Sequence, residues 1–279
     1  MAGFLDIDGH PTWVEDRGGA GVPLLLLHGG LSNSDALLNT LGAGLSSHYR
    51  VIAFDRRGHG YTADTDADFH YDDMARETIS VLETVVGGPA HLVGWSDGGI
   101  VALLVALARP DLVKKMVVIS ANYDVDGVQQ VEMDPDSPVF QELGRAYAER
   151  SPDGPGHFEE VARKAMQLIS SEPSLKTSQI SRIQQAVLVT VGDDDIVTLP
   201  HAISLYEALP NGQLAVVPGT SHGLPMERPA TLTSLILPFL EEDGPPKTLM
   251  PVRRARMSGG NGERTRGDMP ETGMPQRAS

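Results

Sequence analysis

Cysteine is absent from this chain of 279 residues, and no long apolar run occurs in it. The absence of cysteine excludes disulfides, a zinc ribbon and a thiol nucleophile. The longest apolar run in a strand-like segment, Leu24–Leu27, is far too short to span a bilayer. Met1–His10 lacks the basic and apolar regions of a signal peptide. These absences predict a protein of the cytoplasm with no membrane partner.

Positive charge is also scarce, since 22 Lys and Arg stand against 37 Asp and Glu, a net charge of -15. Binding to nucleic-acid phosphates needs a basic face, so nucleic acid is not expected as the main ligand. Hydrophobic residues make up 41% and charged residues 21%. Both values are typical of globular proteins and exclude wholesale disorder. The length suits one globular domain with some elaboration.

The composition changes near Asp243. Residues 244–279 contain six Gly, five Pro, seven Lys or Arg and three Asp or Glu, which gives this segment a net positive charge. No apolar periodicity continues past Leu240. We therefore predict a disordered basic tail over residues 244–279.

Strand-like and helix-like patterns alternate through the body of the chain. The strand candidates are Gly3–Asp8, Thr12–Glu15, Pro23–His28, Arg50–Asp55, Ala90–Gly94, Lys115–Ser120, Ala186–Val191 and Gln213–Val217. The helix candidates are Asp35–Leu45, Asp72–Val86, Asp97–Ala108, Pro200–Leu209 and Pro229–Leu240. Continuous apolar stretches such as Leu24–Leu27 are typical of strands buried on both faces. The alternation predicts an α/β fold, a doubly wound and mostly parallel eight-stranded sheet whose first two strands form an antiparallel hairpin at its edge.

One segment, residues 122–182, interrupts this alternation. Phe140 and Tyr147 share a helical face, as do Phe158 and Leu168. A long insertion in a compact domain is usually functional or disordered, and helical periodicity favours a small helical lid. Residues 1–121 and 183–243 are then the core of the domain. Large side chains of the insertion, Met133 among them, indicate a moderately apolar pocket.

The clearest chemical motif is Gly94-Trp95-Ser96-Asp97-Gly98-Gly99, which follows an apolar strand and opens a helix-like run. A G-x-S-x-G pattern between a strand and a helix is the nucleophile elbow. Gly94 and Gly98 leave room in a tight turn where side chains would collide. We predict Ser96 as the nucleophile.

A serine hydroxyl needs a base, and the base needs an acid that orients it. In the elbow fold the chain order is Ser, then Asp or Glu, then His. His222 lies in a small-residue loop after the last predicted strand and is the predicted base. Three aspartates follow Gly192. We predict Asp195 as the acid, with Asp193 as the alternative.

A tetrahedral oxyanion also needs N–H donors. The predicted donors are the backbone of Asp97 and that of Gly30, with Leu31 as the alternative to Gly30. Leu31, Trp95, Tyr123 and Asp97 are the predicted substrate contacts. Two interpretations of the Asp97 carboxylate stay open: it pairs with a substrate ammonium, or it interacts with the dipole of the helix that it opens.

Two other patterns fail closer tests. Gly58–Ala63 fits a dinucleotide-binding pattern after a strand, but no helix pattern opens there to hold a pyrophosphate. The segment Asp64-x-Asp66-x-Asp68 continues with Phe69 and Ala75 where an EF-hand needs Gly and Glu. We therefore expect neither a cofactor nor a metal ion.

Together these features make residues 3–242 resemble an α/β-hydrolase-fold serine hydrolase, and the turn Asp55–Gly60 resembles the one after the fourth strand in that superfamily. The elbow hexapeptide with Ser221-His222-Gly223 is most similar to the biphenyl-hydrolase-like (valacyclovir-hydrolase-like) esterases. The resemblance implies cofactor-independent cleavage of a small carboxylic ester, lactone or amide through an acyl-enzyme. Serine at the elbow argues against the dehalogenases and epoxide hydrolases of this fold, which have aspartate there.

Two alternatives remain. The same triad serves C–C bond hydrolysis, perhydrolysis or acyl transfer on this fold, because the fold does not determine the reaction. A ligand-binding receptor with low turnover would keep the pocket without efficient chemistry. Neither the substrate nor the oligomeric state follows from the sequence.

Overall fold

The computed structural model describes residues 1–129, 134–244, 246 and 248–253. These residues form one eight-stranded sheet. Its strands are β1 (Ala2–Ile7), β2 (His10–Asp16), β3 (Pro23–Leu27), β4 (Arg50–Phe54), β5 (Ala90–Trp95), β6 (Val113–Ile119), β7 (Ala186–Gly192) and β8 (Gly212–Val217). They are ordered β1-β2-β4-β3-β5-β6-β7-β8. Only the pairings of β2 with β1 and with β4 are antiparallel. The predicted eight-stranded sheet and its edge hairpin are confirmed.

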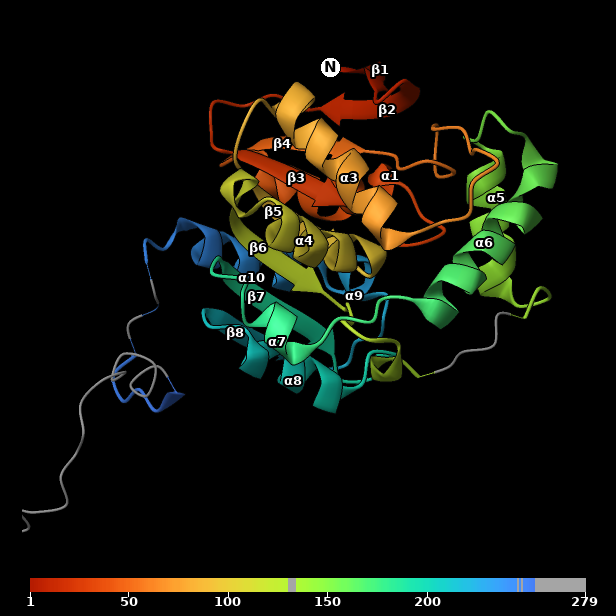
Figure 1. Ribbon diagram of the computed structural model, residues 1–279. Coiled ribbons are helices and arrows are strands. Elements are labelled where there is room, and N and C mark those ends of the chain that lie inside the picture. Colours follow the sequence, from red (N-terminus) through yellow and green to blue (C-terminus); the bar gives the residue numbers. More distant parts are fainter. Residues whose placement is uncertain (130–133, 245, 247, 254–279) are drawn as a thin grey trace, which may run out of the picture. The chain divides into compact units, whose positions relative to one another are not determined.

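Helices cover both faces of this sheet (Figure 1). The α-helices are α1 (Ser34–Leu37), α2 (Ala43–Leu45), α3 (Tyr71–Val81), α4 (Asp97–Ala108), α5 (Pro138–Ala148), α6 (Phe158–Ser171), α7 (Thr177–Ile180), α8 (Leu199–Ala208), α9 (Leu224–Glu227) and α10 (Pro229–Glu241). Two π-helical segments, η1 (Leu38–Gly42) and η2 (Leu82–Val86), continue α1 and α3, and three short 3-10 turns are η3 (Pro110–Leu112), η4 (Val125–Gly127) and η5 (Pro155–His157). The helical run predicted from Asp35 is thus present but changes geometry at Leu38. None of the helices within the described ranges is long and apolar enough to cross a membrane.

The side chains of β3 show why its sequence is a continuous apolar run. Leu25 and Leu27 belong to the hydrophobic core under α3 and α4, whereas Leu24 and Leu26 belong to the core under α1, α2 and α10. Successive residues of a strand point to opposite faces, so a strand covered on both sides buries every side chain. Burial of each leucine contributes about 1.5–3 kcal/mol. The four leucines of this strand therefore help to pack helices against both faces of the sheet.

Three helices, α5, α6 and α7, lie between β6 and β7, in the predicted insertion. The ring of Phe158 on α6 packs against Phe140 and Tyr147 of α5, with centroid distances of 5.1 and 5.5 Å. This contact joins the two helical faces that the sequence predicted. Helices α5 and α6 stand beside the sheet (Figure 1). Met133 lies outside the described residues.

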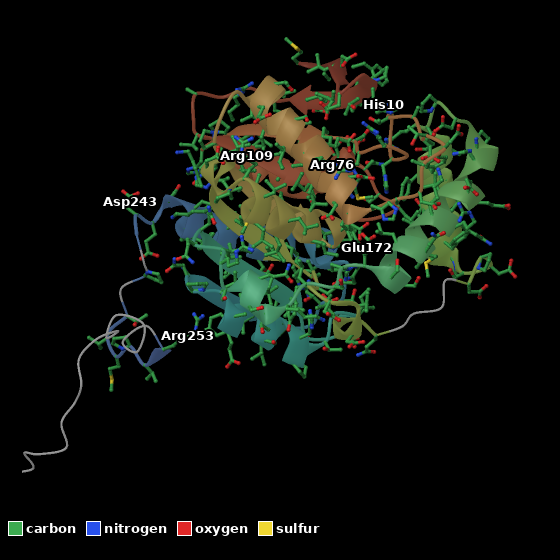
Figure 2. The ribbon with its side chains drawn as sticks, in the orientation of Figure 1. His10, Arg76, Arg109, Glu172, Asp243 and Arg253 are labelled. Carbon is green, nitrogen blue, oxygen red and sulfur yellow. The ribbon has the colours of Figure 1, made fainter. Side chains whose placement is uncertain are left out.

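Charged contacts tie the insertion to the loop between β4 and α3. The buried ammonium of Lys164 on α6 donates to Asp64 at 2.8 Å, and the imidazole of His157 lies 2.8 Å from the same carboxylate oxygen. Glu172, which lies just after α6 and is labelled in Figure 2, accepts a hydrogen bond from the backbone N–H of Tyr71 at 3.0 Å. Removing one partner of a buried ion pair leaves the other charge uncompensated, so separating the insertion from this loop costs free energy.

The chain divides into a unit from Met1 to Pro245 and a second from Pro246 to Ser279. The sheet and the insertion belong to the first unit. Most of the tail predicted at residues 244–279 lies outside the described residues.

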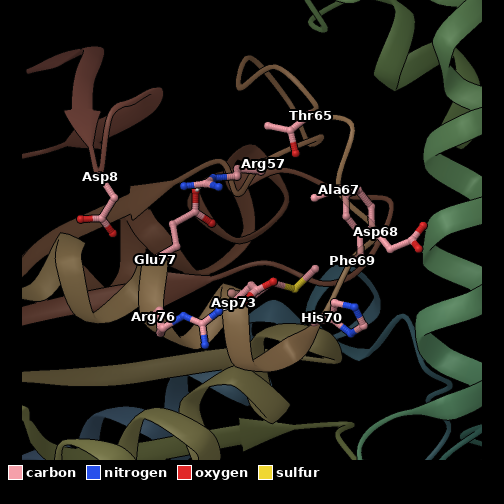
Figure 3. Close-up of a pocket in the computed structure, with 11 residues that line it drawn as sticks. Asp8, Arg57, Thr65, Ala67, Asp68, Phe69, His70, Asp73, Arg76 and Glu77 are labelled. Carbon is pink, nitrogen blue, oxygen red and sulfur yellow. Dashed lines mark hydrogen bonds and ion pairs between the residues drawn. The ribbon is translucent and has the colours of Figure 1, made fainter.

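A cavity of about 390 Å³ opens between the β1–β2 turn, the loop after β4 and α3 (Figure 3). Glu77 of α3 lines it and is only 5% exposed. Its Oε1 lies 3.8 Å from Nε of Arg57, and neither atom has a hydrogen-bond partner among the described residues. Burial raises the pKa of Glu77 to about 7, although the nearby Arg57 and Arg56 oppose this shift.

Replacing Glu77 with glutamine is expected to change how stability depends on pH. Because the folded state raises the pKa of Glu77 from 4.5 to about 7, it binds this proton more tightly than the unfolded chain does. The contribution of Glu77 to the free energy of unfolding therefore falls as pH rises through that window, by about 2 to 3 kcal/mol. Urea unfolding at pH 5 and pH 8 should show Glu77→Gln gaining stability relative to the wild type at the higher pH. An equal difference at the two pH values would mean that this carboxyl group titrates normally.

Candidate active site

The turn between β5 and α4 places Ser96 in a strained conformation. Its φ is 53° and its ψ is -122°, in a region that residues other than glycine rarely adopt. A Cβ added to Gly98 would overlap the carbonyl oxygen of Leu27, and one added to Gly94 would overlap that of Gly98. The glycines of the motif are therefore required by close backbone packing, and the serine side chain projects from a tight turn at the carboxyl end of the sheet.

A chain of hydrogen bonds joins three residues from three different loops. The Ser96 hydroxyl lies 3.0 Å from Nε2 of His222, and Nδ1 of His222 lies 2.9 Å from Oδ1 of Asp195. These residues follow β5, β8 and β7, whose carboxyl ends meet at one edge of the parallel sheet. The structure thus brings together the three residues that the sequence singled out as nucleophile, base and acid.

Both oxygens of the Asp195 carboxylate accept hydrogen bonds. Its Oδ1 also accepts the backbone N–H of Val197 at 3.0 Å, and its Oδ2 accepts the Ser120 hydroxyl at 2.5 Å and the N–H of Gly192 at 3.4 Å. Burial disfavours the charged form, but the hydrogen bond and charge of His222, with help from Ser120, hold the pKa of Asp195 below its usual value. These contacts favour the charged form of Asp195 next to the imidazole of His222.

Asp193, the alternative acid, has another place in the structure. Its Oδ1 accepts the backbone N–H of Thr220 at 3.2 Å. Asp193 thus supports the loop that leads to His222, while Asp195 contacts the imidazole itself.

Ser120 is a site residue that the sequence analysis did not identify. It directly follows β6, with a positive φ of 50°, and its hydroxyl donates to a carboxylate 75 positions further along the chain. The available signal was its position: a polar residue directly after an apolar strand that lies between β5 and β7 in the sheet.

The loop after β3 lies against the elbow. A Cβ added to Gly29 would lie 2.9 Å from the Trp95 ring and 3.3 Å from Cβ of Ser96. One added to Gly30 would lie 2.5 Å from Oδ2 of Asp97. The backbone of Gly30 therefore lies close to the side chain of Asp97, and any larger residue at position 30 would displace that carboxylate.

Three other residues, Trp95, Tyr123 and Leu31, were predicted to contact the substrate. The indole N–H of Trp95 donates to the carbonyl of His222 at 2.9 Å, so Trp95 supports the histidine loop. The Tyr123 ring stacks on His201 of α8 at 4.1 Å, and its hydroxyl lies 2.8 Å from that of Ser204. Leu31, with a positive φ of 51°, lines a cavity of about 400 Å³. Contact of these side chains with a substrate stays a prediction.

The Asp97 carboxylate faces the protein interior. Asp97 is 4% exposed, and its Oδ1 accepts the Tyr71 hydroxyl at 2.8 Å. Burial raises the pKa of Asp97, while the Arg56 guanidinium and the Tyr71 hydroxyl act in the opposite direction. These contacts favour a structural role for this carboxylate over its pairing with a substrate ammonium, which stays a prediction.

Comparison with known proteins agrees with this geometry. The model of the alpha/beta hydrolase family matches residues 24–234, which is most of the chain. The protein belongs to the alpha/beta hydrolase family, as the elbow and fold predicted.

Curated relatives of this chain have different names. A non-heme chloroperoxidase of Streptomyces lividans is 30% identical, and the match covers 84% of this chain and 97% of the relative. A protein of Variovorax paradoxus described as putative carbamate hydrolase RutD is 39% identical over 40% of this chain. The chain spans about half the length of two curated relatives that it matches, 54% and 42%.

Among solved structures, a serine hydrolase involved in carbazole degradation, the CarC enzyme, superposes with a TM-score of 0.72. It is 23% identical, and the superposition covers 86% of this chain and 98% of that one. At this level of identity the likeness concerns the fold.

Gly98→Ala is expected to be strongly destabilising, although alanine is the better helix former and Gly98 lies in the first turn of α4. The added methyl group would overlap the carbonyl oxygen of Leu27, and backbone cannot move aside cheaply. We expect a loss of about 3 kcal/mol or more in denaturant unfolding. The control is Gly156→Ala in the insertion, where an added Cβ meets no atom of the described part of the chain within 4 Å. That change should alter stability by less than about 0.5 kcal/mol; equal effects of the two substitutions would contradict the packing argument.

Proposed function

We propose that this protein is a cofactor-independent serine hydrolase that cleaves a small carboxylic ester, lactone or amide through an acyl-enzyme. The observation that carries the proposal is the hydrogen-bond chain from Ser96 through His222 to Asp195. In this mechanism His222 takes the Ser96 proton as the hydroxyl oxygen attacks the carbonyl carbon, then protonates the leaving group. Water activated by His222 then hydrolyses the acyl-enzyme. Asp195 stabilises the imidazolium that forms in both steps.

The backbone N–H groups of Asp97 and Gly30 are the proposed oxyanion donors. Their support is positional: Asp97 follows the nucleophile at the start of α4, and Gly30 contacts the side chain of Asp97. Donors fixed before the reaction stabilise the developing charge without a cost of reorganisation.

The insertion at residues 122–182 is proposed as the lid over this site. The 400 Å³ cavity supports this, because it brings the insertion together with Leu31 beside the candidate oxyanion loop and Met226 on α9. From the insertion, Leu143 and Tyr147 supply apolar surface and Arg150 supplies a polar group. A pocket of this size and mixed character suits a small, moderately apolar substrate, as in the biphenyl-hydrolase-like esterases that the sequence resembles.

Other reactions of the same triad remain the alternatives. The relatives are described as a chloroperoxidase and a carbamate hydrolase, so proteins of similar sequence are assigned different chemistry. C–C bond hydrolysis, perhydrolysis and acyl transfer would use the same Ser96 and differ in the attacked group or the acceptor. A receptor with low turnover would need no ordered triad, and the continuous hydrogen-bond chain argues against it.

Short-chain nitrophenyl esters test the proposal. The wild type should hydrolyse them, and Ser96→Ala should lose at least about 10³-fold in kcat, since no other group replaces the nucleophile. Activity that survives in the variant would rule out Ser96. A folded wild type that turns over none of these esters would favour the receptor or one of the alternative reactions.

The two aspartates can be separated by matched substitutions. Asp195→Asn should lower kcat by about 10³ to 10⁴, because the amide no longer holds the required histidine tautomer. Asp193→Asn alters only the support of the Thr220 loop and should cost less than about tenfold. Nitrophenyl ester hydrolysis near neutral pH measures both, and the reverse order of effects would make Asp193 the acid.

A further inference from the structure

We infer that Arg56 and His28 are positioning residues that fix the peptide group between Gly29 and Gly30, and so aim the N–H of Gly30 at the oxyanion. This inference rests on the proposed function and deepens it. It assigns a role to two residues that touch neither the nucleophile nor the base.

Arg56 holds the loop after β3 from inside the protein. It follows β4 and is entirely buried. Its Nη1 donates to the carbonyl of His28 at 2.7 Å, and its Nη2 donates to the carbonyl of Gly29 at 3.1 Å. One guanidinium therefore binds two successive carbonyls, and its planar fork leaves the loop little freedom to rotate.

His28 makes the second contact with the same peptide. The backbone N–H of Arg56 donates to Nε2 of His28 at 3.2 Å, so Nε2 carries no proton. Nδ1 lies 2.7 Å from the carbonyl oxygen of Gly29 and is then the protonated nitrogen that donates to it. Burial, the Arg56 charge and His59 lower the pKa of His28 well below its usual value, which keeps the ring neutral in this tautomer.

Planarity of the peptide converts these contacts into an orientation of the N–H group. In a trans peptide the carbonyl and the N–H of the next residue point in opposite directions. The Gly29 oxygen is held by two donors, Arg56 and His28. The N–H of Gly30 is therefore held on the opposite edge, away from Arg56, while Gly29 itself packs against Ser96.

Charge links this loop to the other proposed donor. A buried guanidinium needs a nearby anion; burial lowers the pKa of Arg56, and Asp97 followed by Glu77 opposes that effect most strongly. Asp97 is also the residue whose own N–H is the first proposed oxyanion donor. The charge of Arg56, which binds the loop of the second proposed donor, thus also interacts favourably with the side chain of the first.

The test compares Arg56→Lys with Arg57→Lys. Lysine keeps the charge but not the planar fork, and Arg57 is a matched neighbour whose Nε faces Glu77. With nitrophenyl butyrate we expect Arg56→Lys to lower kcat by about 10- to 100-fold with little change in KM, since an oxyanion donor is worth about 10² to 10³. Affinity for butylboronic acid, which forms a tetrahedral adduct with a serine, should fall by a similar factor. Arg57→Lys should match the wild type in both measurements.

A second pair of variants covers the case in which Arg56→Lys does not fold. His28→Asn keeps an amide N–H near the position of Nδ1, whereas His28→Leu removes the donor. We expect His28→Asn to retain at least tenfold more kcat than His28→Leu at matched thermal stability. The same kcat in both His28 variants, or wild-type kcat and boronic acid affinity in folded Arg56→Lys, would overturn the inference while leaving the proposed function intact. A wild type that neither hydrolyses the ester nor binds the boronic acid would end both.

Discussion

The close approach of two backbone segments, the loop after β3 and the turn after β5, is the constraint on which the site depends. β3 and β5 are neighbouring parallel strands, so their carboxyl ends deliver these segments to the same place. Added side-chain atoms at Gly29, Gly30, Gly94 or Gly98 would meet backbone or side-chain atoms of the opposing segment or of the turn itself. The strained φ of Ser96, the buried side chain of Asp97 and the hydrogen bonds of Arg56 all lie where these two segments meet.

The fold and the three central residues could be predicted because each has a local signal. The four leucines of β3 form an apolar run typical of a strand that is covered on both faces. The elbow has its glycines within five residues, and His222 is marked by the small residues around it and by its place after the last strand. Chain order on a parallel sheet then places serine, aspartate and histidine at one edge, whatever the side chains elsewhere.

What the sequence did not reveal depends on contacts between distant positions. Ser120 binds a carboxylate 75 positions away, Arg56 binds a loop 28 positions away, and Lys164 pairs with an aspartate 100 positions away. Such partners have no common periodicity or motif, and a lone charged residue is usually an exposed one. The Asp97 carboxylate illustrates this limit: its position beside the nucleophile suggested a substrate contact, and only the structure shows that it accepts a hydrogen bond from Tyr71 and is near the charge of Arg56.

The ionic contacts that hold the insertion in place involve residues from two separate parts of the chain. Lys164 and His157 lie within the insertion, but the Asp64 carboxylate that receives them lies on the loop between β4 and α3. Glu172, just after α6, in turn reaches the first residue of α3. A foreign insertion placed in this chain would therefore need groups that match Asp64 and the backbone N–H of Tyr71. In engineering, the loop from Asp55 to His70 and the helices α5 and α6 are therefore best exchanged together, so that each ionic group keeps its partner.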